Sequence, residues 1–313
     1  MDRVITRITA MQHLSIPFFF GLRLTSNRAS HKEVKRYMPI FNKIAVLEKC
    51  QETSLFHHEI YSANAQPKHS FTCMRGKTLE INVVPNKICP GDCLYCPNKA
   101  TLRKTVERES FYPIDQVINA AVSRFIHQEP IERILLTGYG DPALNKDLSG
   151  LFNRFAEVTS LPIAVKSCGT LLWRESVRHD LMKADAVHIN IDAADKHMFG
   201  VVNKLHLQIP FVRYMDGIDK FRRYFPGEFI VHVHLLDGIN TGDAHLERLS
   251  VLLRQLKPFK VIVHALSAPG GDGHRTDVGT CSLHRFMSRL VPIAEIDRDD
   301  QLSPAWQGKH YAK

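Results

Sequence analysis

The sequence predicts an α/β protein whose parallel sheet curves into a barrel. Two observations lead to this prediction: short β-branched runs alternate with longer amphipathic stretches from residue 79 onward, and several of the runs are apolar on one face only. Such alternation indicates successive strand–helix units with parallel strands. A flat sheet covered by helices on both sides would make both strand faces apolar, whereas a barrel carries its helices only on the outside. The one-sided pattern therefore favours the barrel.

Six strands and five helices are expected in turn. The strands are predicted where Val, Ile and Leu are concentrated, at residues 79–84, 133–138, 162–167, 186–192, 229–236 and 260–266. The helices are predicted where apolar residues recur with helical spacing, at residues 114–128, 146–159, 174–184, 210–225 and 243–256. We expect three regions: a basic N-terminal extension, 1–70, a core domain, 71–281, and a C-terminal helix and tail, 282–313.

The last three predicted strands carry the candidate substrate residues on one face. Apolar residues alternate there with polar ones, which are His188, Asn190, Asp192, His232, His234 and His264. Successive residues of a strand point to opposite faces, so the polar set shares a face. Burying imidazoles without hydrogen-bond partners is costly. We therefore predict that these side chains point into the barrel and line a polar substrate cavity. The alternative is that individual histidines are hydrogen-bonded core or loop residues.

The positive charge of the chain is concentrated near its start. The formal net charge is +9, and residues 1–70 hold 10 Lys and Arg against 5 Asp and Glu, which is +5 and leaves +4 for the rest. A basic segment of this kind favours an anionic partner such as RNA. A later cluster, "NKATLRKTVER", is expected either to be solvated or to contact an anionic substrate or redox partner.

Composition indicates a globular protein of a reducing compartment. Hydrophobic residues make up 44% of the chain and charged residues 23%, which suits a sizeable core. Seven cysteines, an odd and scattered set, do not indicate a disulfide framework. No run approaches the roughly 20 apolar residues of a membrane span. We expect a cytoplasmic protein that does not associate with membranes.

Three cysteines are closely spaced in "NKICPGDCLYCPNK", residues 86–99, where Cys89, Cys93 and Cys96 are separated by three and two residues. A structural zinc site takes four ligands, usually as two close pairs, so Cys73 or His69 would have to complete one here. Three thiolates around a cubic 4Fe-4S cluster leave one iron open to a substrate or cofactor. The spacing favours such a cluster over zinc and over three unrelated cysteines. The loop also follows the first strand, at the end where barrels gather their ligands.

This motif resembles that of the radical S-adenosylmethionine superfamily. The resemblance rests on the C-x3-C-x2-C spacing with an aromatic residue, Tyr95, before the last cysteine, and it covers residues 71–266. It implies a partial (βα)6 barrel, a 4Fe-4S cluster bound by Cys89, Cys93 and Cys96, and the cofactor S-adenosylmethionine near Tyr95. It also implies that a one-electron reduction cleaves the cofactor to methionine and a 5′-deoxyadenosyl radical, which abstracts a hydrogen atom from the substrate.

Two further segments match what the resemblance implies. "TGYGDP", residues 137–142, follows the second strand, where family members place a glycine-rich turn for the methionine amino group. Glycines let backbone carbonyls approach an ammonium closely, and a carboxylate can complete its hydrogen bonding, so the candidate cofactor residues are Gly138, Tyr139, Gly140 and Asp141. After the third strand, Ser167 of "KSCGTLLW" is the candidate hydroxyl contact near the ribose and carboxylate of the cofactor.

The resemblance extends to one branch of the superfamily. "RGKTLEINVVPNKICPGDCLYC", "KTVERESFYP", "TGYGDPALNKDL" and "NIDAADKHMF" are similar to segments of wyosine-type tRNA-modifying synthases and molybdenum-cofactor biosynthesis enzymes. We therefore predict radical modification of a small molecule, a nucleotide or an RNA base, with an electron donor such as flavodoxin or ferredoxin. The alternatives are an activating enzyme that generates a glycyl radical on a partner protein, and a metal-stabilised RNA-binding protein.

Overall fold

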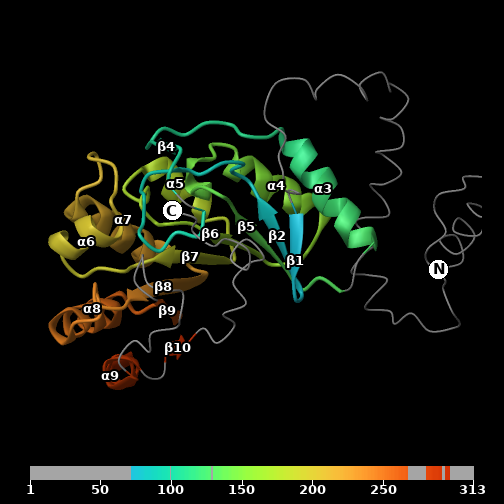
Figure 1. The fold of residues 1–313 in the computed structure, drawn as a ribbon. Helices are drawn as coiled ribbons and strands as arrows, with labels where there is room; N and C mark the ends of the chain where they lie inside the picture. Colours follow the sequence, from blue (N-terminus) through green and yellow to red (C-terminus); the bar gives the residue numbers. More distant parts are fainter. Residues whose placement is uncertain (1–71, 99, 128–129, 267–279, 291–292, 297–313) are drawn as a thin grey trace, which may run out of the picture. The chain divides into compact units, whose positions relative to one another are not determined.

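The structure, a computed structural model, describes residues 72–98, 100–127, 130–266, 280–290 and 293–296 (Figure 1). All of them belong to one compact unit, Gln51–Lys313. The expected N-terminal extension, 1–70, and the end of the expected tail, 297–313, lie outside the described residues. The described residues therefore comprise the barrel and the elements attached to it.

One sheet of eight strands forms the centre of the described part. In spatial order the strands are β1 (Thr72–Arg75), β2 (Thr78–Asn82), β5 (Arg133–Thr137), β6 (Ile163–Lys166), β7 (Ala186–Asn190), β8 (Glu228–Leu236), β9 (Lys260–Leu266) and β10 (Ala294–Ile296). β1 pairs with β2 in antiparallel fashion, and every other neighbouring pair is parallel. The six expected strands are therefore adjacent in chain order, and the predicted α/β fold with a partial barrel is confirmed.

Helices connect the parallel strands. They are α3 (Ile114–His127), α4 (Leu148–Val158), α5 (Glu175–Leu181), α6 (Lys196–Val202), α7 (Phe211–Tyr224), α8 (Asp243–Leu256) and α9 (Thr280–Leu290). The apolar stripes of these helices pack on the sheet, as Phe155, Phe221 and Leu249 illustrate, since each is fully buried in the core. None of the described helices combines the length and the apolar character that a membrane crossing requires.

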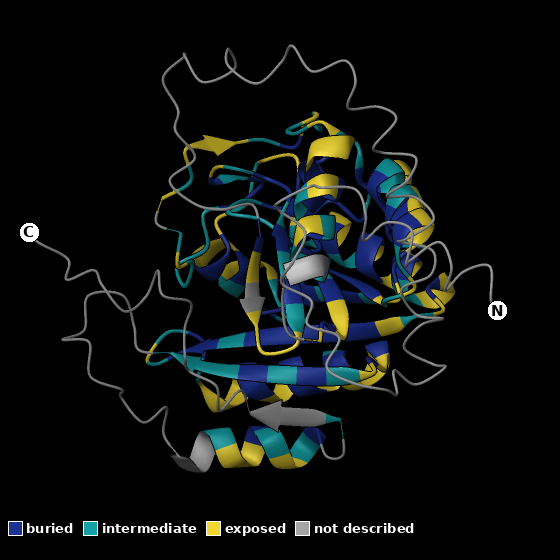
Figure 2. Ribbon diagram, turned by 90° about the vertical axis from the view of Figure 1, so that its right-hand side faces the viewer, coloured by how far each residue is buried: buried dark blue, intermediate teal, exposed yellow. Residues whose placement is uncertain are grey.

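Fully buried residues alternate with partly buried ones along much of β7 and β9 (Figure 2). Val187, Val231 and Val261 are fully buried and belong to the hydrophobic core shared with the helices. The alternate residues of the same strands face away from these helices. The burial of branched side chains on one face contributes most of the stabilisation of such a sheet, at about 25 cal/mol per Å² of apolar surface. The other face is left for polar side chains.

The structure adds elements to those expected. β1 forms a hairpin with β2 through Gly76, whose φ of +55° suits glycine. β10 extends the sheet beyond β9, after a C-terminal helix that begins at Thr280, two residues before the expected region. α6 was not expected because it has only seven residues, of which two, Phe199 and Val202, are buried. Its start is set by Asp195, whose carboxylate accepts a hydrogen bond from Met198 N.

Candidate functional site

The three motif cysteines lie in the loop after β2, and we call residues 86–98 the cysteine loop. Cys89 ends the short strand β3 (Ile88–Cys89), which pairs in parallel with β4 (Arg103–Lys104) and closes the loop at its base. Cys96 N donates to Cys93 O at 3.1 Å, so the second half of the motif is a tight turn. All three residues are free thiols, with Cys89 buried and the others partly buried. The loop therefore presents three sulfurs near the carboxyl ends of the barrel strands.

The glycine turn after β5, residues 138–141, packs against the cysteine loop. Asp141 N donates to Ile88 O at 3.1 Å. A Cβ on Gly140 would lie 1.8 Å from the same carbonyl oxygen, so only glycine allows the two backbones to approach this closely. Tyr139 O accepts a hydrogen bond from Asn98 Nδ2 at 2.9 Å. Two segments that are far apart in the sequence thus form one unit.

Asp141 joins the glycine turn to the loop after β6. The side chain is fully buried, and its Oδ1 accepts hydrogen bonds from Ser167 Oγ at 2.7 Å and from Ala143 N at 3.0 Å. Its Oδ2 accepts one from Thr170 Oγ1 at 3.2 Å. Burial raises the pKa of Asp141, and the hydrogen bonds oppose that rise. The expected cofactor residues Asp141 and Ser167 are therefore in direct contact, and Asp141 also orders both loops.

A fourth thiol and a lysine lie beside the motif cysteines. Cys168 Sγ is 3.9 Å from Cys89 Sγ, because the loop after β6 reaches the cysteine loop. Lys87 Nζ donates to Cys96 Sγ at 2.6 Å. Burial opposes the charge of Lys87, but Cys96 and Cys89 hold the pKa of this lysine above its ordinary value. An ammonium at this position offsets part of the negative charge that ionised thiols bring to the loop.

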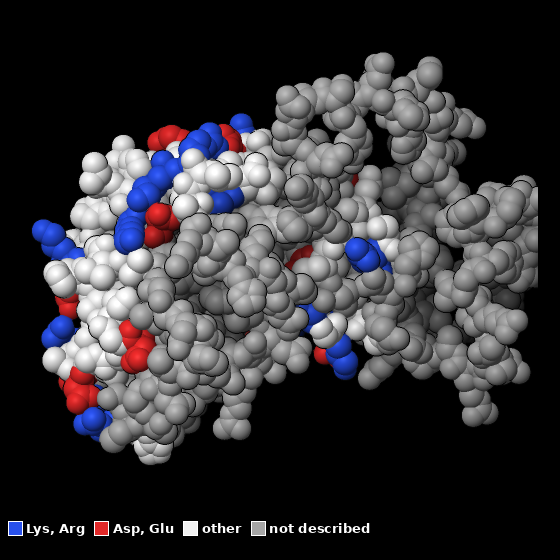
Figure 3. Space-filling view, viewed as in Figure 1, with Lys and Arg blue, Asp and Glu red and all other residues white. Residues whose placement is uncertain are grey.

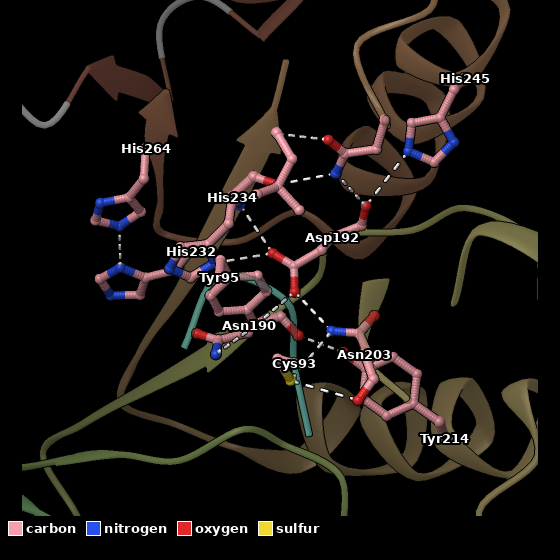
Figure 4. A network of polar contacts seen from close by, with 12 residues as sticks. Cys93, Tyr95, Asn190, Asp192, Asn203, Tyr214, His232, His234, His245 and His264 are labelled. Carbon is pink, nitrogen blue, oxygen red and sulfur yellow. Dashed lines mark hydrogen bonds and ion pairs between the residues drawn. The ribbon is translucent and has the colours of Figure 1, made fainter. Parts of the chain in front are cut away.

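Asp192 connects the cysteine loop to the polar face of the sheet (Figure 4). Its Oδ2 accepts hydrogen bonds from Tyr95 Oη at 2.7 Å and from Asn203 Nδ2 at 2.8 Å. Its Oδ1 accepts two from His234, from the backbone N–H at 2.8 Å and from Nδ1 at 2.9 Å. Burial alone would raise the pKa of Asp192, but the electrostatic attraction of His234 and these hydrogen bonds hold the pKa below its ordinary value. Asp192 is therefore an ionised acceptor at neutral pH.

The four expected histidines lie together on the polar face of β7, β8 and β9. His232 links two of them: its Nε2 is 2.9 Å from His188 Nδ1, and its Nδ1 is 2.8 Å from His264 Nε2. His234 stacks on the rings of Tyr95 and His264, with centroid separations of 3.8 and 4.6 Å. A continuous series of ring contacts therefore leads from the cysteine loop to His188.

Three of these imidazoles are neutral at neutral pH. Burial, assisted by the charge of Lys166, lowers the pKa of His188 to about 4 and that of His232 well below its ordinary value. Burial and the nearby His234 and Lys166 lower the pKa of His264 to about 3. A neutral imidazole carries one donor and one acceptor. These three rings thus carry hydrogen-bonding groups of both kinds without the positive charge of imidazolium.

Several supporting residues were not expected from the sequence. Asn203 follows α6, Tyr214 Oη donates to Asn190 O, and Asn240 Nδ2 donates to Asp192 O at 3.1 Å. They come from helices and loops outside the predicted strands, and no motif spacing marks them. Asn190 Nδ2 donates to Tyr95 Oη at 3.1 Å, but Asn190 Oδ1 and Asn203 Oδ1 are buried without a hydrogen-bond partner among the described residues. Such atoms are suited to accept hydrogen bonds from a polar ligand.

The thiols fit an iron–sulfur cluster better than a single metal ion. No three His, Cys, Asp or Glu side chains of the described residues converge on a single-ion position. In a cubic cluster each ligand thiolate binds a different iron, so the thiolates do not converge on one point. Cys73, one of the two possible fourth zinc ligands, is exposed on β1 and contacts Glu80, while His69 lies outside the described residues. The donor set of three free thiols beside an ammonium therefore suits the cluster.

Basic residues that follow the cysteine loop are held by neighbouring groups. Arg108 pairs with the largely buried Asp180 at 2.5 Å and anchors the segment 105–109 to α5. Arg103 pairs with Glu109, and Lys104 Nζ donates to Lys204 O at 2.8 Å. On the face in Figure 3, the described acidic and basic side chains are interspersed. Arg108 therefore has a structural role, which differs from both expectations for this cluster, and Lys99 lies outside the described residues.

A partial barrel that carries a three-cysteine loop at the carboxyl ends of its strands defines a class of enzymes. The sequence profile of the Radical SAM superfamily matches residues 83–249, and the chain belongs to this superfamily. Its members are enzymes that use a 4Fe-4S cluster and S-adenosylmethionine and that need a reductant.

Individual proteins are also similar to this chain. The chain is 29% identical to a UPF0026 protein of Methanocaldococcus jannaschii over 196 residues, which are 62% of this chain and 61% of that protein. It is 30% identical to the GTPase Obg of Brachyspira hyodysenteriae over 186 residues, which are 59% of this chain and 27% of that protein. The chain thus spans less than two thirds of both relatives. A radical SAM methyltransferase from Sphaerobacter thermophilus, 16% identical, matches 72% of this chain and 67% of its own chain with a TM-score of 0.52, which shows the shared fold.

Proposed function

We propose that the chain binds a 4Fe-4S cluster through Cys89, Cys93 and Cys96 and acts on a polar substrate held at the histidine face. The substrate classes that suit this face are a small molecule, a nucleotide or an RNA base. When bound, the cluster supplies the electron that cleaves S-adenosylmethionine to a radical capable of abstracting hydrogen. The observation that carries the proposal is the direct hydrogen bond from Tyr95 of the cysteine loop to Asp192, which makes the loop and the polar face one site.

The residues around the cysteine loop are suited to hold the cofactor. The glycine turn, with Gly138, Tyr139, Gly140 and Asp141, would receive the methionine ammonium, because its backbone approaches the cysteine loop without intervening side chains. Ser167, whose hydroxyl proton is donated to Asp141, would accept a hydrogen bond from the ribose. Tyr95 would contact the cofactor with a ring that His234 already holds in place. Lys87 offsets the negative charge of the thiolates.

The histidine face favours a substrate with both donors and acceptors. His188, His232 and His264 are neutral, and His232 uses both of its ring nitrogens to hold the other two. His188 and His264 would therefore recognise hydroxyl, amide or base-edge groups more readily than a strongly anionic group. Asn190 Oδ1 supplies a buried acceptor for such a ligand. The resemblance of several segments to wyosine-type tRNA-modifying synthases and molybdenum-cofactor biosynthesis enzymes is our reason for including a nucleotide or RNA base. A flavodoxin or ferredoxin in the cytoplasm would supply the electron.

Metal analysis of the anaerobically reconstituted full chain tests this function. About four iron atoms per chain are expected, together with reductant-dependent cleavage of S-adenosylmethionine. Cys93→Ala should lose iron and cleavage, whereas Cys73→Ala should retain both, because Cys73 is exposed on β1 and its thiol contacts Glu80. One zinc per chain and no cofactor cleavage would refute the proposal. Salt-dependent RNA binding in a protein that cleaves no cofactor would support the RNA-binding alternative instead.

A further inference from the structure

The segment that follows α6 holds the cysteine loop from one side. Among the described residues, three backbone hydrogen bonds of 2.7 to 3.2 Å join the cysteine loop to the segment 202–206. A Cβ on Gly91 would lie 2.9 Å from Asn203 O, so the two backbones are in close contact. Lys204 adopts a φ of +44°, which turns the chain directly after Asn203. The position of Asn203 relative to Cys93 is therefore fixed by main-chain contacts.

The side chain of Asn203 lies between Asp192 and Cys93. It is 7% exposed, and its Nδ2 is 2.8 Å from Asp192 Oδ2 and 3.8 Å from Cys93 Sγ (Figure 4). The amide nitrogen carries two protons, one for each contact. Because the ionised carboxylate of Asp192 can only accept, it fixes which end of the amide faces the sulfur. The end that faces Cys93 is therefore the donor end.

The partner of Cys93 changes when its sulfur becomes a metal ligand. In the free thiol, Cys93 Sγ is 3.6 Å from Asn203 O and can donate its proton to that carbonyl. A thiolate ligand has no proton to donate, so the N–H of the Asn203 side chain becomes its hydrogen-bond partner. Hydrogen bonds to the sulfurs are among the factors that set the reduction potential of an iron–sulfur cluster. A donor at a ligand sulfur stabilises the added negative charge of the reduced state and raises the potential.

We propose that Asn203 is a positioning residue that donates a hydrogen bond to the Cys93 thiolate and raises the reduction potential of the cluster. Asp192 holds the amide in the required orientation. The inference rests on the proposed function, because it requires Cys93 to be a ligand. Asn203 lies outside the cysteine motif, and its proposed effect is on the electron-transfer step, not on substrate contact.

Redox titration of the reconstituted full chain, followed by electron paramagnetic resonance, tests the inference. Asn203→Leu removes the donor at similar volume and is expected to shift the midpoint potential to more negative values with unchanged iron content. Asn145→Ala is the matched control, because Asn145 is an equally buried asparagine whose side chain bonds Val83 O and touches no cysteine. It should keep the wild-type potential. An unchanged potential in fully loaded Asn203→Leu would overturn the inference, whereas wild-type protein without a cluster would overturn the proposed function instead.

A measurement on the wild-type protein covers the case in which Asn203→Leu fails to fold. The chain is labelled with ¹⁵N at the asparagine side-chain amides, and the reduced cluster is studied by pulsed electron paramagnetic resonance. A hyperfine coupling to an amide nitrogen is expected, since the donor contacts a ligand sulfur. Two other asparagines near the motif, Asn98 and Asn190, donate to Tyr139 O and to Tyr95 Oη instead. An Asn98→Ala protein should therefore retain the coupling, and its absence from the wild-type protein would refute the hydrogen bond.

Discussion

Replacing Asp192 with alanine is expected to destabilise the protein strongly, because this carboxylate satisfies several buried donors. It accepts hydrogen bonds from Tyr95 Oη, from Asn203 Nδ2 and from two groups of His234, all at 2.7 to 2.9 Å. A hydrogen bond to a charged group contributes about 1.5 to 3 kcal/mol, and each buried donor left without a partner costs roughly 1 to 3 kcal/mol. With partial relaxation of the donors, we expect a loss of about 4 kcal/mol, which is large for one substitution.

Equilibrium urea unfolding of the cluster-free full chain at neutral pH measures this loss. Asp216→Ala is the control, because Asp216 is exposed and pairs only with Lys220, one helical turn away. Such a surface pair contributes about 0.5 kcal/mol or less. A loss below about 1 kcal/mol in Asp192→Ala would refute the reasoning, since it would mean that the buried donors do not depend on this carboxylate.

Four other experiments probe separate parts of the molecule. Gly140→Ala should prevent stable folding, because the added Cβ would lie 1.8 Å from a backbone oxygen of the cysteine loop. Thermal unfolding measures this effect, and an unchanged melting temperature would contradict it. The pKa of His188 is lowered to about 4, so acid favours the unfolded chain, in which the ordinary value is near 6.5. Between pH 8 and pH 5, the free energy of unfolding of the wild-type protein should therefore fall by about 2 kcal/mol more than that of His188→Gln. Equal pH profiles for the two proteins would contradict this prediction. Asp141→Ala should weaken the binding of S-adenosylmethionine about tenfold to a hundredfold, because Asp141 orders two loops of the site. Calorimetry measures the affinity, and the iron content should be retained. A wild-type affinity would show that Asp141 is not part of the cofactor site. Mild oxidation of the cluster-free protein by a small-molecule disulfide should join Cys89 to Cys168, because their sulfurs are 3.9 Å apart. Peptide mapping detects the bond, and a map that lacks the Cys89–Cys168 pair would contradict the geometry.

The strands and their two faces were predictable because they depend on local pattern. Buried strands need branched apolar residues at every second position, and that period is visible in the sequence between residues 186 and 266. The same period placed four histidines on one face, and the structure shows those histidines in mutual contact. The cysteine motif was visible because all three of its thiols lie within eight residues.

The contacts that organise the site were not predictable, because they join segments far apart in the chain. Cys168 follows β6 and Cys89 follows β2, and the two meet because only β5 lies between these strands in the sheet. Asn203 reaches Cys93 across 110 residues. α6 has only seven residues, which is too short to produce a clear helical period, so the residue at its end could not be placed. A lone asparagine or a lone cysteine carries no pattern, and only the three-dimensional structure gives it a partner.

Asp192 accounts for the link between the polar face and the cysteine loop. Parallel strands bring their carboxyl ends to one edge, and Asp192 stands two residues beyond the end of β7 at that edge. From there one oxygen serves Tyr95 and Asn203, while the other serves His234. A ligand that changes the hydrogen bonding of His234 must therefore also change the hydrogen bonding of Asp192. Tyr95 and Asn203, which lie beside the cysteines, donate to this same carboxylate. The histidine face and the cysteine loop are therefore joined through one buried side chain, whose hydrogen bonds gain strength from its low-dielectric surroundings.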